Sequence, residues 1–436
     1  MNHIVPKLLI YGDMPRDSIL MEMSGIFADF EAGVVPEDEL VARIHRQIRR
    51  ILEVATDNGF DVNLWQNYLT FLLVTSENPF SITCEKVGAS EGSVNYFAKG
   101  DFKAFKELFD YDFDPIEEKL HIDCFSRITH YHAISKKELM YNKNVSEKVQ
   151  ALSAALAETK DEEEFFDCVT GFYKDYGVGM FGLNKAFRIQ SGDHDGDVTF
   201  LPINNMDKVM LDDLIGYELP KKKLVDNTRA FVEGRKCNNV LLYGDSGTGK
   251  STSIKAIVNQ FYPDGLRMIE IYKHQFKDLS GVIARIKNRN YKFIIYMDDL
   301  SFEEFEVEYK FLKAVIEGGV ETKPDNILIY ATSNRRHLIK EVWSDRDDME
   351  NGGGLHRSDT MEEKLSLVHR FGATINYSKP TPKEFKEIVL GLAHRAQIAM
   401  PDEELLAEAN KWELSHGGIS GRTAQQFINY VQSVHG

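Results

Sequence analysis

The sequence predicts an α/β fold in its second half, with a parallel five-stranded sheet, a small helical domain after it and a mainly α-helical N-terminal domain before it. From residue 239 on, short uninterrupted apolar runs alternate with helical patterns, which is typical of strands covered on both faces. Strands that alternate with helices in this way form a parallel sheet. The first 190 residues instead space their apolar side chains mostly as helices do.

Length and composition indicate a folded protein of two or three domains. The chain has 436 residues, of which 43% are hydrophobic and 28% charged. No stretch approaches the roughly 18–20 apolar residues of a membrane span, and the short apolar patch near the N-terminus is unlike a secretory signal. The net charge of −16 argues against general adhesion to nucleic acid, although it does not exclude a local basic channel.

The four cysteines favour a reducing compartment. They lie far apart and form no C-x-x-C pair, so reduced thiols are favoured over a disulfide framework or a zinc site. We therefore expect a cytoplasmic protein with no membrane partner. The four are Cys84, Cys124, Cys168 and Cys237.

The N-terminal domain is expected to span residues 1–190 and to be mainly helical. Apolar spacing predicts helices within 36–55, 62–75 and 145–159. Several aromatic residues could form a base-stacking platform, but their near-helical spacing favours core positions. They are Phe97, Phe102, Phe105, Phe109, Tyr111 and Phe113.

An Asp- and Gly-rich stretch, 191–197, follows this domain. It resembles a calcium loop but lacks the bidentate glutamate of an EF-hand, so a polar surface linker at 191–204 is favoured. The expected α/β domain then spans 205–380, and the helical C-terminal domain spans 381–436. The five expected strands of the sheet lie at 239–243, 268–272, 293–297, 327–331 and 373–377.

The segment Gly244–Ser251 fits G-x-x-x-x-G-K-[ST] at every defined position, directly after a strand and at the start of a helix. Glycines allow backbone N–H groups to point at a phosphate, and the helix N-terminus adds partial positive charge. Lys250 can reach the β and γ phosphates of ATP, and the Ser251 hydroxyl can ligate Mg²⁺. The expected nucleotide-binding residues are Gly244, Asp245, Ser246, Gly247, Thr248, Gly249, Lys250, Ser251 and Thr252.

The strand at 293–297 ends in two acids, Asp298 and Asp299. It delivers both carboxylates to the rim of the sheet, where ligands gather in such folds. Asp298 is expected to hold Mg²⁺ as a Walker-B acid does, and Asp299 to orient and activate the attacking water. An alternative is that Asp299 caps the next helix, and its side chain is one methylene shorter than glutamate.

With these motifs in place, residues 205–436 resemble an AAA+ ATPase module. The resemblance implies a P-loop NTPase three-layer sandwich with a helical lid. It places Gly216 and Tyr217 near the adenine base and makes Asn334, in Thr332-Ser333-Asn334, the sensor of the γ-phosphate. Asn334 could instead be a helix N-cap.

The resemblance also assigns two arginines. Arg370, in the segment 364–372, is similar to the arginine finger that a neighbouring subunit supplies, which implies a homo-oligomer. Arg335, Arg336, Arg346 and Arg357 lie in the same interval and are competitors, and Arg370 could pair with an acid on its own subunit. Arg422, in the segment 418–424, is similar to the lid arginine known as sensor 2.

The lid has clear helix boundaries of its own. Thr381-Pro382-Lys383-Glu384 is a capping box with proline at the first helical position. Gly417 and Gly418 break a second helix before the last one begins at Ser420, which leaves Arg422 in its first turn.

The combined motifs are similar to an uncharacterised bacterial AAA+ family of unknown function that has a helical N-terminal region. Asp298-Asp299-Leu300-Ser301-Phe302, 331–335 and 363–372 are the segments that resemble it. Helicase loaders and transposition-type ATPases resemble the chain less closely. The resemblance says little about residues 1–190 and supplies no partner.

The expected function is Mg²⁺-dependent hydrolysis of ATP to ADP and phosphate by an oligomer that remodels or loads an unknown protein or nucleic-acid partner. The residues expected to act in catalysis are Lys250, Asp299, Asn334, Arg370 and Arg422. A nucleotide switch or scaffold with little turnover is the main alternative, because Asp299 stands where glutamate is usual. A small-molecule P-loop kinase is disfavoured, because it would need an acceptor pocket and because Asn334 followed by Arg422 in a helical lid points away from it. Tyr272 lies near the place of a threading loop, but is equally well explained as a core residue.

Overall fold

The computed structural model describes residues 1–134, 141–192, 194, 197–204, 206–301, 308–317, 324–334 and 370–435. The chain separates into two compact units, Met1–Asn184 and Lys185–Gly436. Within the described ranges, no helix has both the length and the apolar character needed to cross a membrane.

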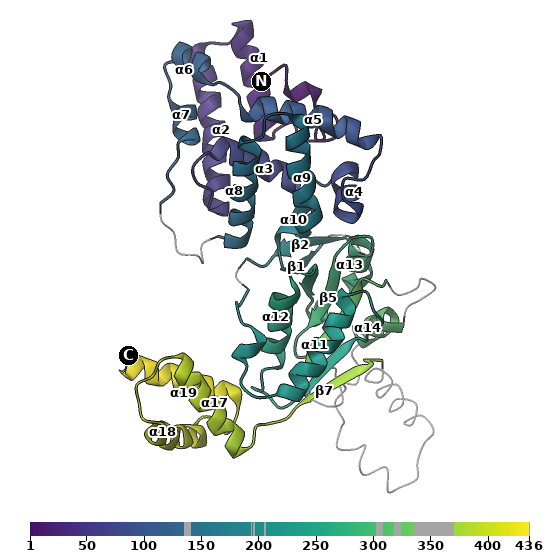
Figure 1. The fold of residues 1–436 in the computed structure, drawn as a ribbon, viewed down its shortest axis with the longest axis vertical. Helices are drawn as coiled ribbons and strands as arrows, with labels where there is room; N and C mark the ends of the chain where they lie inside the picture. The colour runs from purple at the N-terminus through teal and green to yellow at the C-terminus, as the bar shows by residue number, and fades with distance from the viewer. Residues whose placement is uncertain are drawn as a thin grey trace. The chain divides into compact units, whose positions relative to one another are not determined.

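The first unit is helical, as predicted (Figure 1). The predicted helices are confirmed within α2, α3 and α8, and Phe102 and Phe105 are fully buried in the core. Phe97, however, is 53% exposed, so it is not a core residue. The helices are α1 (Ile19–Ala32), α2 (Glu37–Asn58), α3 (Leu64–Thr75), α4 (Pro79–Val87), α5 (Val94–Phe109), α6 (Asp114–Leu120), α7 (Cys124–Thr129), α8 (Lys143–Ala157), α9 (Glu162–Tyr176) and α10 (Gly179–Leu183).

The second unit is built on a seven-stranded sheet with the order β2-β1-β4-β5-β6-β3-β7. The five predicted strands are present and pair in parallel. The strands are β1 (Ala186–Ser191), β2 (Val198–Pro202), β3 (Val240–Gly244), β4 (Leu266–Glu270), β5 (Lys292–Met297), β6 (Ile327–Ser333) and β7 (Ala373–Tyr377).

The prediction of a polar linker at 191–204 is wrong. Strands β1 and β2 form an antiparallel hairpin that extends the sheet beside β4, with Ile189 opposite Phe200. The Asp- and Gly-rich stretch connects these two strands, because such residues also suit hairpin turns. The compact unit accordingly begins at Lys185, before the expected boundary.

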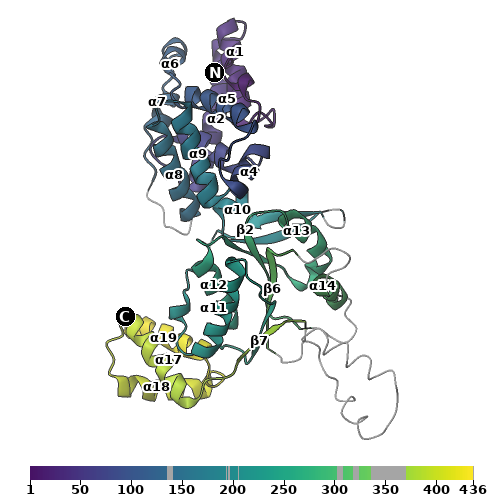
Figure 2. The ribbon, with the colours of Figure 1, turned by 45° about the vertical axis from the view of Figure 1, so that its right-hand side comes forward.

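Helices cover both faces of the sheet (Figure 2). On one face, α11 (Glu218–Val232) and α12 (Lys250–Phe261) share a core with the strands through Leu224, Ile257 and Tyr296. Helices α13 (Leu279–Ile286) and α14 (Glu308–Glu317) lie on the other face. The three-layer P-loop architecture is therefore confirmed, and the sheet is larger than predicted.

The lid consists of α17 (Pro382–Arg395), α18 (Asp402–Ser415) and α19 (Gly421–His435), which share a core of their own. The predicted capping box at Thr381 is confirmed, with Glu384 as its second member. At the start of α19, the Thr423 N–H donates to Ser420 Oγ at 3.1 Å. This cap places Arg422 in the first turn, as predicted.

Candidate functional site

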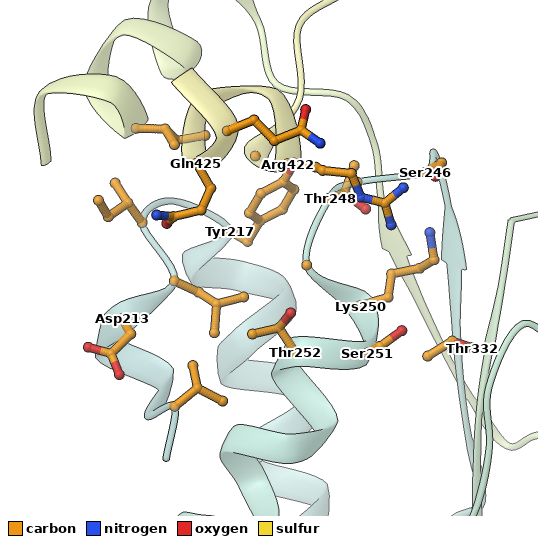
Figure 3. A pocket seen from close by; sticks show the side chains of 18 of the residues that line it. Asp213, Tyr217, Ser246, Thr248, Lys250, Ser251, Thr252, Thr332, Arg422 and Gln425 are labelled. Atoms are coloured by element: carbon orange, nitrogen blue, oxygen red, sulfur yellow. The ribbon is translucent and has the colours of Figure 1, made fainter. Parts of the chain in front are cut away.

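A cavity of about 660 Å³ lies between the P-loop (Gly244–Ser251), the carboxyl ends of β5 and β6, and the lid (Figure 3). Its position matches the rule that ligands bind at the carboxyl ends of parallel strands. Its lining residues are Val209, Asp213, Leu214, Ile215, Tyr217, Ser246, Gly247, Thr248, Gly249, Lys250, Ser251, Thr252, Asp298, Asp299, Thr332, Asn334, Ile388, Leu392, Gly421, Arg422, Gln425 and Gln426.

The P-loop connects β3 to α12 through backbone conformations that require glycine. Gly244 has φ 132°, and a Cβ there would lie 2.2 Å from the Tyr377 carbonyl oxygen. Gly249 has φ 88° immediately before the first residue of α12. These turns leave the N-terminus of α12 open to the cavity, which is the arrangement that binds phosphate.

Lys250 is 6% exposed and uses all three ammonium protons. They go to the carbonyl oxygens of Gly244 at 3.0 Å and Asp245 at 2.6 Å, and to Asn334 Oδ1 at 3.0 Å. Burial lowers the pKa of Lys250, and nearby carboxylates, first Asp245, oppose that shift. Phosphate oxygens can replace the neutral acceptors, because they bind an ammonium more strongly.

One oxygen of Asp298 collects three hydroxyl donors. Its Oδ1 accepts from Ser251 Oγ at 2.7 Å, Tyr296 Oη at 2.7 Å and Thr332 Oγ1 at 2.6 Å. Burial favours the neutral acid, but the hydrogen bonds from Thr332, Tyr296 and Ser251 together lower the pKa of Asp298. The group is therefore a carboxylate beside a hydroxyl, a pair of hard oxygen ligands suited to Mg²⁺.

Asp299 lies next to this pair in an unusual backbone conformation, with φ 50°. Its N–H donates to Thr332 Oγ1 at 2.9 Å, and its Oδ1 accepts from Asn334 Nδ2 at 2.8 Å. Asn334 thus joins the acid to Lys250. The structure brings together Lys250, Asn334 and both predicted acids.

The lid closes the cavity from the opposite side to α12. The Arg422 N–H donates to the Gly247 carbonyl at 3.1 Å, so the start of α19 docks on the P-loop. In Figure 3 the Arg422 side chain extends toward the loop that carries Ser246 and Thr248, and Gln425 lies one turn further along α19. The lid arginine is therefore at the phosphate end of the cavity.

The other end of the cavity is mainly apolar. The Tyr217 side chain lines it, its hydroxyl donates to the Ser378 carbonyl at 3.1 Å, and its ring stacks on Tyr377 at 5.2 Å. Tyr217 has φ 58°, a strained conformation for a bulky residue. Aliphatic neighbours complete the wall: Val209, Leu214, Ile215, Ile388 and Leu392. Such a surface fits a flat, apolar base.

Three predicted nucleotide-binding residues do not line the cavity: Gly216, Gly244 and Asp245. The carboxylate of Asp245 instead accepts the Lys379 N–H at 2.8 Å, so it holds the connection from β7 to the lid.

The predicted arginine finger does not line the cavity either: Arg370 is among the described residues and is not part of the lining. Its competitors Arg335, Arg336, Arg346 and Arg357 lie outside the described residues.

Sequence reasoning missed Tyr296, Thr332, Asp213 and Gln425 as site residues. A signal existed for two of them: Tyr296 precedes Asp298 by two positions, and Thr332 precedes Asn334 by two. Along a strand this spacing puts side chains on the same face. For Asp213 and Gln425, only the approach of the lid to the segment before α11 assembles the surface.

Comparison with protein families gives a match over the second unit. Residues 183–435, more than half of the chain, match the family described as “Protein of unknown function (DUF815)”, and the chain belongs to this family. No curated protein matches the chain in sequence.

Among solved structures, two RuvB mutants from Thermotoga maritima are 19% and 18% identical, with TM-scores of 0.36. The matched region covers 52% of this chain and 65% of theirs, just under two thirds of their length. The AAA domain of FIGL-1 in complex with ADP is 17% identical over 53% of this chain and 76% of that one, with a TM-score of 0.36.

Proposed function

We propose that this family member is an Mg²⁺-dependent AAA+ ATPase that hydrolyses ATP to ADP and phosphate. One observation carries the proposal: a continuous set of hydrogen bonds runs from the P-loop lysine through an amide to two acids and two hydroxyls, all at the P-loop end of one cavity. Its members are Lys250, Asn334, Asp299, Thr332, Asp298 and Ser251.

The residues present fit the metal that such a reaction uses. Ser251 and Asp298 would hold Mg²⁺, since their oxygens already lie 2.7 Å apart and the acid is ionised. Bound there, Mg²⁺ would neutralise charge on the β- and γ-phosphate oxygens.

The remaining residues would position the reacting groups. Lys250 would exchange its carbonyl acceptors for β and γ oxygens of ATP, and Arg422 would contact the phosphates from the lid. Asp299 would orient the attacking water and accept its proton as the new O–P bond forms and the bond to the β–γ bridging oxygen breaks. Asn334 would contact the γ-phosphate, and Tyr217 would pack near the adenine.

We further propose that the active form is a homo-oligomer in the cytoplasm, with Arg370 as the finger for a neighbouring site. Arg370 follows the interval 335–369 and does not line the cavity of its own chain, which supports action on another subunit. Movement of the lid during turnover would remodel or load a protein or nucleic-acid partner. The four cysteines, which form no disulfide in the described part of the chain, support the compartment.

Steady-state hydrolysis with Mg²⁺ across a range of protein concentrations tests the proposal. We expect specific activity to rise with concentration, and Asp299→Asn and Arg370→Ala each to lose about 10³-fold in kcat while still binding ATP. Tight ATP binding by the wild type with turnover no higher than that of Asp299→Asn would instead favour a nucleotide switch. The short Asp299 side chain is the feature that supports that second candidate.

A further inference from the structure

We propose that Thr332 is a positioning residue of the hydrolytic site, which holds Asp299 in the backbone turn from which its carboxylate acts. The inference rests on the proposed hydrolysis of ATP. It assigns a role to a residue that the P-loop and the two acids leave unexplained.

The first observation is that the Thr332 hydroxyl bridges both acids. Because the Asp299 N–H can only donate, Thr332 Oγ1 accepts it at 2.9 Å, and the hydroxyl proton goes to Asp298 Oδ1 at 2.6 Å. Thr332 is 1% exposed, so water does not substitute easily for these bonds. The single hydroxyl therefore sets the position of one acid relative to the other.

The second observation is the left-handed backbone of Asp299, with φ 50°. Such a conformation is strained for most residues other than glycine and persists only where neighbours hold it. Thr332 holds this conformation through two hydrogen bonds, one to its side chain and one to its backbone. The hydroxyl accepts the Asp299 N–H, and the carbonyl accepts the Leu300 N–H at 2.7 Å.

The turn determines where the Asp299 carboxylate lies. Thr332 and Asn334 are two residues apart at the end of β6, so the same strand holds the backbone of Asp299 through Thr332 and its side chain through Asn334 at 2.8 Å. A displaced Asp299 carboxylate would no longer position the attacking water. ATP would still bind, because its phosphates contact the P-loop. A shift of about 1 Å at such a group can cost 10²-fold in rate.

Four variants of full-length protein separate positioning from stability. Thr332→Val keeps the β-branched shape and removes both hydroxyl bonds, and Thr332→Ser keeps the hydroxyl. Tyr296→Phe removes one bond to Asp298 and none to Asp299. Thr374→Val, at an exposed threonine of β7, controls for the substitution itself. We would measure kcat, KM, ATP affinity, melting temperature and a crystal structure of Thr332→Val.

We expect Thr332→Val to lower kcat about 10- to 100-fold with KM and ATP affinity within twofold, and Thr332→Ser to recover most of the loss. Asp299 should leave its left-handed conformation in the Thr332→Val crystal. Wild-type kcat in Thr332→Val, an unchanged Asp299 φ, or an equal loss in Tyr296→Phe would each overturn the positioning role. A wild type without turnover would overturn it together with the proposed function, whereas an active wild type with an equally active Thr332→Val overturns the positioning role alone.

Discussion

Buried carboxylates of the N-terminal unit and the two acids that follow β5 have different kinds of partners. In the N-terminal unit, Asp101 is 1% exposed, and its oxygens accept the backbone N–H groups of Leu9, Ile10 and Tyr11 at 2.8–2.9 Å. Glu117 is 8% exposed and accepts two backbone N–H groups at the start of α7, together with the hydroxyl of Ser126.

The acids of the cavity have side-chain donors instead. Asp298 accepts from three hydroxyls, and the Asp299 carboxylate accepts from the Asn334 amide. A backbone donor cannot leave without unfolding its segment, so Asp101 and Glu117 hold chain segments in place. Side-chain donors can exchange for a ligand, so Asp298 and Asp299 stay available. Exposure follows the same division, because Asp101 and Glu117 are buried whereas Asp298 and Asp299 are exposed.

The largest expected effect separates function from stability at the cavity. Asp298→Asn keeps an acceptor oxygen for the hydroxyls but removes the charge that would hold Mg²⁺. We expect turnover to fall roughly 10³-fold, because several kcal/mol of charge stabilisation is lost. The free energy of unfolding should change by less than about 1 kcal/mol. Parallel ATPase and urea-unfolding measurements check both, and a loss of stability with full turnover would contradict the comparison.

The next effect reverses that pattern in the N-terminal unit. Asp101→Ala leaves the N–H groups of Leu9, Ile10 and Tyr11 without their side-chain acceptor, the last of them buried, and we expect a loss of about 3 kcal/mol in unfolding free energy with ATP affinity unchanged. Asp110→Ala is the matched control, because Asp110 lies near the end of the same helix in an exposed i,i+4 pair with Lys106. That control should cost less than about 0.5 kcal/mol. Equal losses in the two variants would remove the distinction.

The smallest effect concerns Glu384, an exposed carboxylate that also accepts a backbone N–H group. Hydrogen bonds from the Thr381 backbone and side chain lower the pKa of Glu384. Its stabilisation of the lid is therefore present above the unfolded-state pKa and lost as the pH falls through the lower folded-state pKa. Melting curves of wild type and Glu384→Gln should differ only slightly at neutral pH, because solvent screens this exposed group, and should converge in acid. Curves that diverge in acid would contradict the assignment.

Prediction from sequence worked where the signal is local. The five parallel strands, the P-loop turn into α12 and the Thr381 capping box each depend on residues within one short segment. Prediction failed at the β1–β2 hairpin, because the same Asp- and Gly-rich composition suits a linker and a strand connection. For Asp245, the position in the loop does not reveal that its carboxylate turns to the Lys379 N–H.

The P-loop turn between a buried strand and a helix follows from the sequence alone, because glycine, lysine and serine at fixed spacing dictate it. Which side chains meet at that loop depends on the tertiary structure. Thr332 reaches the two acids across 34 and 33 positions of sequence, and the lid reaches Gly247 from the far end of the chain. Contacts between distant segments depend on sheet order and lid docking, and local patterns of residue type carry no information on either.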